Sequence, residues 1–193
     1  DSTTLSAQAI KNIQTTNFNN IKDYDLITLD NTLNSLRGLN NKIIINFVPI
    51  STTQYAQNIQ LINQINQQQV NDLYKVINKY PQLNIYLSSI SHTIIRQIKA
   101  TNPSNKIGVV LSPYETNYID VDFYIFSPEM LSYPILKQQL EFNKETMISS
   151  RGCGEMMIIY NFFNSLPQNE ANELFNSISF ISDYPLIIYK LFN

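Results

Sequence analysis

The sequence has few of the residues that build the common chemical sites. Among 193 residues there are one cysteine, one histidine and no tryptophan. The single cysteine excludes an internal disulfide, and without CxxC or HxxxH spacing the common zinc sites are excluded as well. Cysteine usage therefore leaves the compartment open, and we expect a soluble chain that is either extracellular or cytoplasmic.

Charge and long apolar runs are also scarce. Charged residues make up 15% of the chain, and the 13 lysines and arginines are scattered singly. Because no basic stripe is present to bind a phosphate backbone, the sequence argues against nucleic acid as a partner. No apolar run reaches the roughly 18 residues that cross a bilayer, so we expect no transmembrane segment, and no signal-peptide pattern is present. The absence of an initiator methionine before Asp1 leaves open whether the sequence is part of a longer protein.

What the chain does contain is enough apolar side chains for a core. Hydrophobic residues make up 44% of the sequence, and a chain of this length buries roughly 70% of its unfolded surface on folding. We therefore predict one globular domain over residues 1–193.

The most strongly patterned stretch is KIIINFVP, from Lys42 to Pro49. It is short, apolar and rich in β-branched residues, which predicts a buried strand. Alternate residues of a strand share a face, so Ile44, Asn46 and Val48 point the same way. Asn46 is then a lone polar side chain among apolar neighbours. It is either a structural hydrogen-bonding group or the remnant of a ligand site.

Helical and strand patterns alternate along the chain. After a polar stretch at 1–25 that reads mostly as loop, we predict strands at 42–48, 83–89, 107–112, 121–126, 146–150 and 177–181. Periodicity and capping signals predict helices at 26–38, 52–80, 93–101, 127–143, 155–175 and from 182 onwards. This alternation predicts a parallel sheet with right-handed crossovers. The sheet is either open and doubly wound, or a barrel that lacks two of its eight units.

Several helix ends carry recognisable signals. Thr28 and Ser91 are N-cap candidates, and Gly38 is a plausible stop for the first helix. Ser127, followed by proline, predicts the start of a helix that runs to about residue 143, and proline at 167 predicts an interruption of the helix over 155–175.

Five strings, taken in order, resemble motifs of one enzyme family of lipid metabolism, the glycerophosphodiester phosphodiesterases. DSTTL at 1–5 resembles the family's HDxTL without the histidine, and LITLDNTL at 26–33 resembles its IPTLEEVL element. IIINFV at 43–48 falls where the family has its LNIEIK strand, and the stretch from LSSISH to IGVVLS at 87–112 is similar to its ISSF to IGLLL segment. ISFISDYP at 178–185 is similar to its DGIITDYP ending. The resemblance implies an incomplete or truncated (β/α)₈ TIM-type barrel, an α/β fold with about six parallel strands that lacks the first two.

The resemblance also implies a chemistry from which this chain departs. The family hydrolyses glycerophosphodiesters to glycerol phosphate and an alcohol, using Ca²⁺ or Mg²⁺ held by carboxylates and two histidines as acid and base. The histidines and two of the metal carboxylates belong to strands that this chain lacks. The third carboxylate falls at Asn46, the family's lysine at Val48, and its WT pair at Ser149-Ser150. The resemblance therefore implies a degenerate active site.

We accordingly predict no catalytic residue, no metal ligand and no cofactor in this chain. For a small phosphate or phosphodiester, the candidate binding residues are Asn46, Ser88, Ser149 and Arg151. Arg151 stands in a loop after the penultimate strand, where barrels often bind phosphate, although a solvated loop arginine is the more common case.

Three further residues have both a functional and a structural interpretation. We expect His92 to be a solvent-facing residue at a helix start and Cys153 to be an inert turn cysteine, because neither has a predicted partner to activate it. Asp183 is a conceivable metal ligand, but a Ser-Asp pair before a helix with proline in its first turn is first a cap.

Three functional classes stay open. The first is an active phosphodiesterase completed by a longer natural chain, the second a non-catalytic relative that serves as a binding or assembly module, and the third an open doubly wound sheet that binds a small ligand. Asn46 and Val48 favour the second, so we predict a chain that is inactive on its own. An incomplete barrel has two free sheet edges, so we expect residues 1–25 to fold over the gap or two chains to cover each other's edges.

Overall fold

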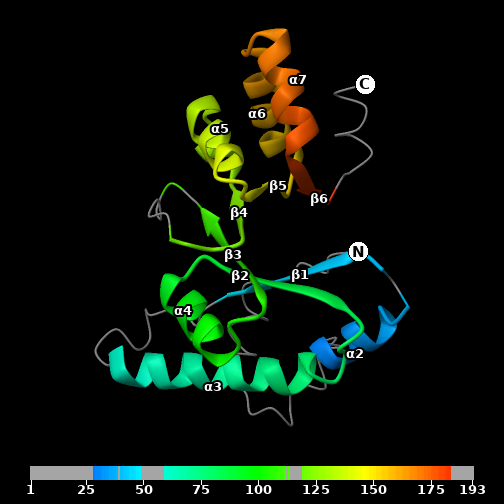
Figure 1. Ribbon diagram of the computed structural model, residues 1–193, viewed down its shortest axis with the longest axis vertical. Coiled ribbons are helices and arrows are strands. Elements are labelled where there is room, and N and C mark those ends of the chain that lie inside the picture. Colours follow the sequence, from blue (N-terminus) through cyan, green and yellow to red (C-terminus); the bar gives the residue numbers. More distant parts are fainter. Residues whose placement is uncertain (1–27, 39, 49–58, 112, 114–118, 184–193) are drawn as a thin grey trace.

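The described part of the chain folds around a six-stranded parallel sheet, whose place among the helices Figure 1 shows. The computed structural model describes residues 28–38, 40–48, 59–111, 113 and 119–183. The strands are β1 (Lys42–Phe47), β2 (Asn84–Ser89), β3 (Lys106–Leu111), β4 (Phe123–Phe126), β5 (Glu145–Ser150) and β6 (Ser179–Ser182). They lie in the order β1-β2-β3-β4-β5-β6, each parallel to the next. This sequential order is that of a barrel, and it rules out the doubly wound alternative, in which the strand order reverses.

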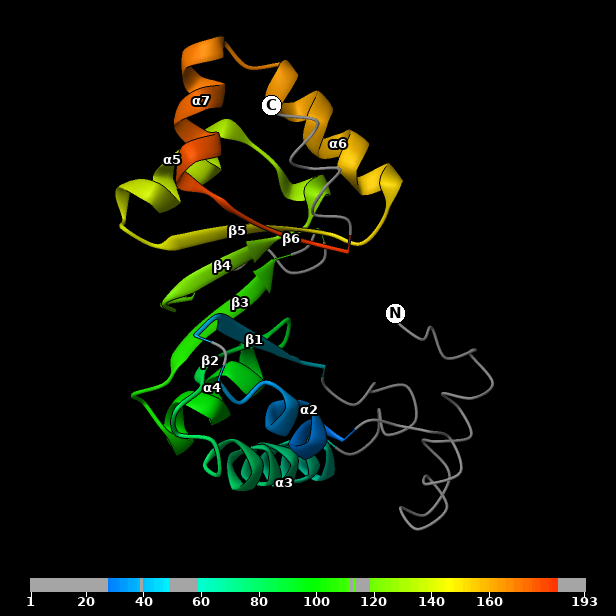
Figure 2. The same ribbon diagram turned by 90° about the vertical axis from the view of Figure 1, so that its right-hand side faces the viewer.

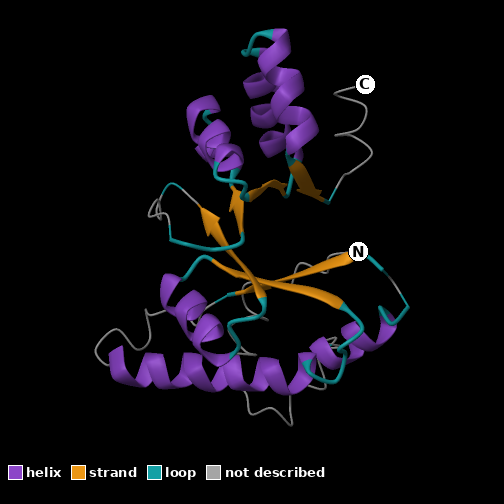
Figure 3. Cartoon of the chain, viewed as in Figure 1, coloured by secondary structure: helices purple, strands orange, loops and turns teal. Residues whose placement is uncertain are grey.

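Helices lie between most successive strands (Figure 3), although between β3 and β4 the described residues contain none. α2 (Leu29–Ser35) precedes β1, α3 (Ile59–Ile77) joins β1 to β2, and α4 (His92–Thr101) joins β2 to β3. The 3₁₀ turn η3 (Pro128–Met130) and α5 (Tyr133–Glu141) lead from β4 to β5, and α6 (Cys153–Asn164) and α7 (Gln168–Ser177) lead from β5 to β6. Figure 2 shows α2–α4 grouped beside the first strands and α5–α7 grouped beside the last ones.

Two predicted helix starts are confirmed by their hydrogen bonds. Thr28 Oγ1 accepts from the backbone N–H of Asn31 at 3.2 Å, and Ser91 Oγ accepts from that of Ile94 at 3.4 Å. Gly38 follows α2 with φ at 91°, in the left-handed region that glycine adopts without strain. Local signals therefore fix where α2 and α4 begin and where α2 stops.

The helix predicted over 127–143 is wrong as a single element. Pro128 opens only the turn η3, and α5 begins afresh at Tyr133. Pro134 explains the break, because proline lacks a backbone N–H and therefore fits the first turn of a helix but not its middle. The helix predicted over 155–175 is α6 and α7, and its interruption near Pro167 is confirmed.

Some sequence predictions fall outside the described residues. They are the loop at 1–25, the first part of the helix predicted at 52–80, and the helix predicted after Asp183. Among the residues that are described, no helix combines the length and the apolar character needed to span a bilayer.

The sheet is curled, and one ion pair shows how strongly. Lys42 on β1 pairs with Glu145 on β5, four strand positions away. With about 4.8 Å between neighbouring strands, a flat sheet would hold β1 and β5 about 19 Å apart. The two side chains meet because the sheet curves into part of a barrel with both of them on its concave face. The Lys42 ammonium also lies 4.6 Å from the centre of the Tyr86 ring.

The convex face of the sheet carries the main core. Apolar residues at alternate positions of the strands join one large cluster with the helices, and Leu87, Val109 and Ile148 are among its fully buried members. The helices add Val70 of α3, Ile94, Ile95 and Ile98 of α4, and Leu136 of α5. This burial explains why the strands contain nearly continuous apolar runs.

The concave face carries a smaller apolar cluster. Phe123, Ile125 and Met147 are buried in it, and the side chains packed against them are Ile44, Tyr86 and Val110. The Phe123 ring lies directly over Gly108, so that a Cβ added to this glycine would overlap the ring. Gly108 therefore lets a phenylalanine of β4 cross the concave face of β3.

Candidate functional site

A pocket lies where the concave face meets the carboxyl ends of β1, β5 and β6. Its volume is about 220 Å³. Its apolar lining comes from strand residues that face the hollow, Ile44, Val110, Ile125 and Ile181. Its polar lining consists of Asn46, Ser149, Ser150, Arg151, Ser182 and Asp183. Because barrels place their sites at the carboxyl ends of the strands, this pocket is the candidate functional site.

Two of the predicted binding residues, Asn46 and Ser88, lie side by side on β1 and β2. They are partners in the strand register, and Ser88 Oγ donates a hydrogen bond to Asn46 Oδ1 at 3.3 Å. Ser88 is fully buried, whereas Asn46 is exposed and lines the pocket. Since Ser88 engages the amide oxygen, the donor that Asn46 offers to a ligand is its NH₂ group.

The end of β5 brings Ser149, Ser150 and Arg151 to the same pocket. The backbone N–H of Arg151 donates to Glu155 Oε2 at 2.6 Å, which ties this turn to the first turn of α6. Arg151 itself is exposed, and it is the cationic residue among the described pocket residues. The structure thus brings Asn46, Ser149 and Arg151 together around one pocket, with Ser88 behind them as a support.

Asp183 lines the pocket as well, directly after β6. Its sequence context favours a helix cap, and that role stays a prediction because the following residues lie outside the described part. Its place in the pocket could have been predicted from the sequence. In a sheet whose strands follow chain order, β6 lies next to β5, so the residue after β6 lies beside Arg151, the residue after β5. Ser150 and Ser182, which are register partners at the ends of β5 and β6, enter the lining for the same reason.

His92 and Cys153 are not among the described pocket residues. His92 begins α4, but its side chain is half-buried rather than solvent-facing. Cys153 is exposed and is the first residue of α6 after the N-cap Gly152, so it belongs to a helix rather than to a turn.

The donors at the pocket do not fit the divalent cation that the resemblance implies. Ca²⁺ takes six to eight oxygen ligands and Mg²⁺ takes six, usually with carboxylates among them. Across residues 28–38, 40–48, 59–111, 113 and 119–183, no three His, Cys, Asp or Glu side chains are placed to hold a metal. The described pocket lining offers the Asn46 amide, the Ser149 hydroxyl, the Arg151 guanidinium and the Asp183 carboxylate. Ser150 and Ser182 lie on the opposite face by strand alternation, and the buried Ser150 hydroxyl donates to the Gly152 carbonyl at 3.4 Å. Neutral donors beside an arginine suit an anion better than a cation.

The fold defines the class of protein, an α/β chain whose six parallel strands curl into part of a TIM-type barrel. The same fold occurs in glycerophosphodiester phosphodiesterases. A provisionally assigned one from Galdieria sulphuraria matches with a TM-score of 0.58 over 92% of this chain and 71% of its own, at 13% sequence identity. One from Parabacteroides distasonis matches with a TM-score of 0.57 over 85% of this chain and 63% of its own, also at 13% identity. The resemblance seen in the sequence motifs is confirmed at the level of the fold.

Comparison by sequence adds no assignment, because no protein-family profile and no curated protein matches the chain. The chain also spans only part of its structural relatives, 71% of the length of the first and 63% of the second. At 13% identity the likeness establishes the fold alone.

Proposed function

We propose that this chain binds a small phosphate or phosphodiester in the pocket at the carboxyl ends of β1, β5 and β6. The observation that carries this proposal is the gathering of one guanidinium, one amide and one hydroxyl around a single pocket, from Arg151, Asn46 and Ser149. A guanidinium presents its donors in a planar fork that matches phosphate oxygens, and neutral donors complete the contacts. The fold shared with glycerophosphodiester phosphodiesterases supports the same class of ligand.

Asp183 narrows the choice of ligand. Its carboxylate opposes a bare phosphate in the same pocket, but it accepts hydrogen bonds from alcohol hydroxyls. A phosphate ester with free hydroxyls, such as glycerol 3-phosphate, gives both Arg151 and Asp183 a partner. The pocket volume of about 220 Å³ lies below the roughly 300–1,000 Å³ of pockets for drug-sized ligands, which also favours a small molecule.

The second part of the proposal is that the chain on its own does not hydrolyse the diester and acts as a pseudoenzyme. Hydrolysis requires a positioned acid or base, and the family that the chain resembles adds a metal to neutralise phosphate charge. His92 is the single histidine of the sequence and is absent from the described pocket lining. Asn46 stands where the resemblance implies a metal carboxylate, and an amide does not supply that charge. These substitutions support a ligand-binding relative of the enzymes.

Calorimetric titration of the full chain with inorganic phosphate, glycerol 3-phosphate and glycerophosphocholine tests the binding. We expect glycerol 3-phosphate to bind more tightly than inorganic phosphate. Arg151→Gln should weaken binding by about tenfold to a hundredfold, because a hydrogen bond to a charged group contributes roughly 1.5–3 kcal/mol. Arg96→Gln, at an exposed position of α4, is the matched control and should leave affinity unchanged. Absence of binding by all three ligands, or equal affinity of the two variants, would overturn the proposal.

Release of glycerol phosphate from glycerophosphocholine, with Ca²⁺ or Mg²⁺ added, tests the second part. We expect no turnover above a blank without protein. Turnover that Arg151→Gln abolishes would identify the chain as an active hydrolase and end the non-catalytic proposal.

A further inference from the structure

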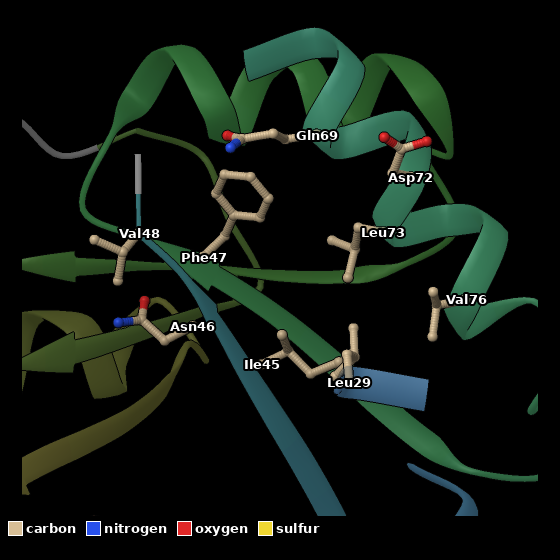
Figure 4. Close-up of a pocket in the computed structure, with 9 residues that line it drawn as sticks. All are labelled: Leu29, Ile45, Asn46, Phe47, Val48, Gln69, Asp72, Leu73 and Val76. Carbon is tan, nitrogen blue, oxygen red and sulfur yellow. The ribbon is translucent and has the colours of Figure 1, made fainter. Parts of the chain in front are cut away.

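The Asn46 amide can offer a ligand either of two opposite groups. Figure 4 shows Asn46 on the opposite side of β1 from Ile45, one of the apolar side chains that line a hollow between β1 and α3. Asn46 is exposed and lines the candidate pocket as well. Rotation of its amide turns either the NH₂ group or the oxygen toward a ligand. An outward NH₂ group attracts an anion, whereas an outward oxygen attracts a cation or a hydrogen-bond donor.

The buried hydroxyl of Ser88 decides between these two orientations. Ser88 is 0% exposed, and the acceptor that the described residues give its hydroxyl is Asn46 Oδ1, at 3.3 Å. With the amide reversed, the NH₂ group would donate to Ser88, and the buried O–H would be left without an acceptor. The cost of a buried donor without a partner favours the observed orientation by roughly fivefold to a hundredfold. A side chain that a ligand cannot reach thus fixes the polarity of one that it can reach.

The strand pairing keeps the two side chains together. Asn46 and Ser88 are register partners near the carboxyl ends of β1 and β2, and both lie on the concave face. Because neighbouring strands lie about 4.8 Å apart, the contact depends on the sheet and not on the position of a loop. A donor that is held in place before a ligand arrives loses little conformational freedom on binding.

We propose that Ser88 is a positioning residue that makes the pocket selective for anions, because it directs the NH₂ group of Asn46 toward the ligand. This inference rests on the proposed function, in which Asn46 and Arg151 donate to the same phosphate. The two donors come from β1 and from the turn after β5. Ser88 is not among the described residues that line the pocket, so it acts through Asn46.

Calorimetric titration of the full chain with glycerol 3-phosphate tests this role. Ser88→Ala should weaken binding about fivefold, because the amide then reverses freely and its rotamer must be fixed on binding. Ser88→Thr keeps the hydroxyl and should restore most of the affinity.

Ser89→Ala is the matched control. Ser89 is also 0% exposed and also bonds to β1, where its hydroxyl donates to the backbone oxygen of Phe47 at 2.6 Å. By strand alternation, however, it lies on the convex face. Ser89→Ala should therefore lower the free energy of unfolding but leave the affinity for glycerol 3-phosphate unchanged. Equal losses of affinity for Ser88→Ala and Ser89→Ala would overturn the inference.

A double-mutant cycle shows whether Ser88 acts through Asn46. Asn46→Ala alone should weaken binding about tenfold, which is the loss of one hydrogen bond to a charged group. Ser88→Ala should then weaken the Asn46→Ala chain no further. If Ser88→Ala cost as much affinity in the Asn46→Ala chain as in the wild type, its role would be a general structural one and the inference would be wrong.

The mobility of the Asn46 amide gives a readout that needs no ligand. Heteronuclear relaxation of its side-chain NH₂ group should show an ordered amide in the wild type and in Ser89→Ala, and a mobile one in Ser88→Ala. A mobile amide in the wild type would overturn the inference even if glycerol 3-phosphate binds. An ordered amide in a wild type that binds no phosphate ligand would overturn the proposed function and, with it, the selectivity inferred from it.

Discussion

The convex and concave faces of the sheet are filled in different ways. The convex face continues into a core with the helices, where Leu87, Val109 and Ile98 are completely buried. The concave face holds a cluster of three buried side chains, with the Lys42–Glu145 pair on the same face and the candidate pocket at the carboxyl ends of the strands. Most of the buried apolar packing that stabilises the fold therefore lies on the convex side. The carboxyl end of the concave side can then carry polar groups.

Two neighbouring residues of β5 give the strongest test of this difference. Ile148 belongs to the convex core and Met147 to the concave cluster, and both are buried. We expect Ile148→Ala to lower the free energy of unfolding by about 2–5 kcal/mol. Met147→Ala should lower the free energy of unfolding by less, because side chains of the small concave cluster can shift into the space that the methionine leaves. Urea unfolding of both variants measures the difference, and an equal or larger loss for Met147→Ala would contradict it.

Gly108 tests the concave face alone. Gly108→Ala should lower the free energy of unfolding by about 1–3 kcal/mol, because its Cβ overlaps the buried Phe123 ring and forces a shift. Gly154→Ala in α6 is the matched control, since a Cβ there meets no atom within 4 Å and alanine favours a helix.

A double variant sharpens this second prediction. Phe123→Leu added to Gly108→Ala should cost less than the sum of the two single changes, because the overlap is removed with the ring. Strict additivity would show that the ring does not hold the glycine in place.

Tyr74 tests the convex side with the smallest change. Its hydroxyl donates to the backbone oxygen of Ile98 at 3.3 Å, between α3 and α4. Tyr74→Phe should cost about 0.5–1.5 kcal/mol at neutral pH, the net worth of one hydrogen bond.

The same residue carries a pH dependence. Burial raises the pKa of Tyr74 from 10.0 to about 12. Because the pKa is higher in the folded state, the stabilisation is fully present below pH 10 and is lost as the pH rises through 12. Unfolding measured from pH 9 to 12 should therefore show a shallower decline for Tyr74→Phe than for the wild type. An identical decline would assign the alkaline loss to other groups.

Most of the secondary structure could be predicted because its signals are local. The β-branched and aromatic runs gave all six strands within two residues of their observed ends, and Thr28 and Ser91 gave two helix starts. The exception is the single helix predicted over 127–143, which breaks before Tyr133. Ser127-Pro128 and Pro134 both carry the signal of a helix start, but the first begins only a 3₁₀ turn and the second begins α5. The polar end of β1 and the loop after β5 led to Asn46 and Arg151, which the structure places on one pocket, while their binding role stays a prediction.

The features that escaped prediction depend on curvature. Lys42 and Glu145 are 103 residues apart in sequence, and they meet only because the sheet curls. The overlap of Gly108 and Phe123 requires the register of β3 and β4, which no local pattern specifies. Asp183 was considered as a metal ligand but interpreted as a helix cap, because the Ser-Asp-Tyr-Pro pattern is a local signal and its place beside Arg151 is not.

The Lys42–Glu145 pair has a mechanical consequence for an arc of strands. A closed barrel fixes its own diameter through the hydrogen bonds around its ring, whereas in the described chain β1 and β6 are not bonded to each other, so no such ring sets the width of the arc. The Lys42–Glu145 pair joins β1 to β5 across the concave face. The two side chains are 31% and 34% exposed, so dissolved salt weakens the attraction between them. Because the two side chains come from strands that are not neighbours, weakening this pair removes a contact across the concave face that no strand hydrogen bond replaces.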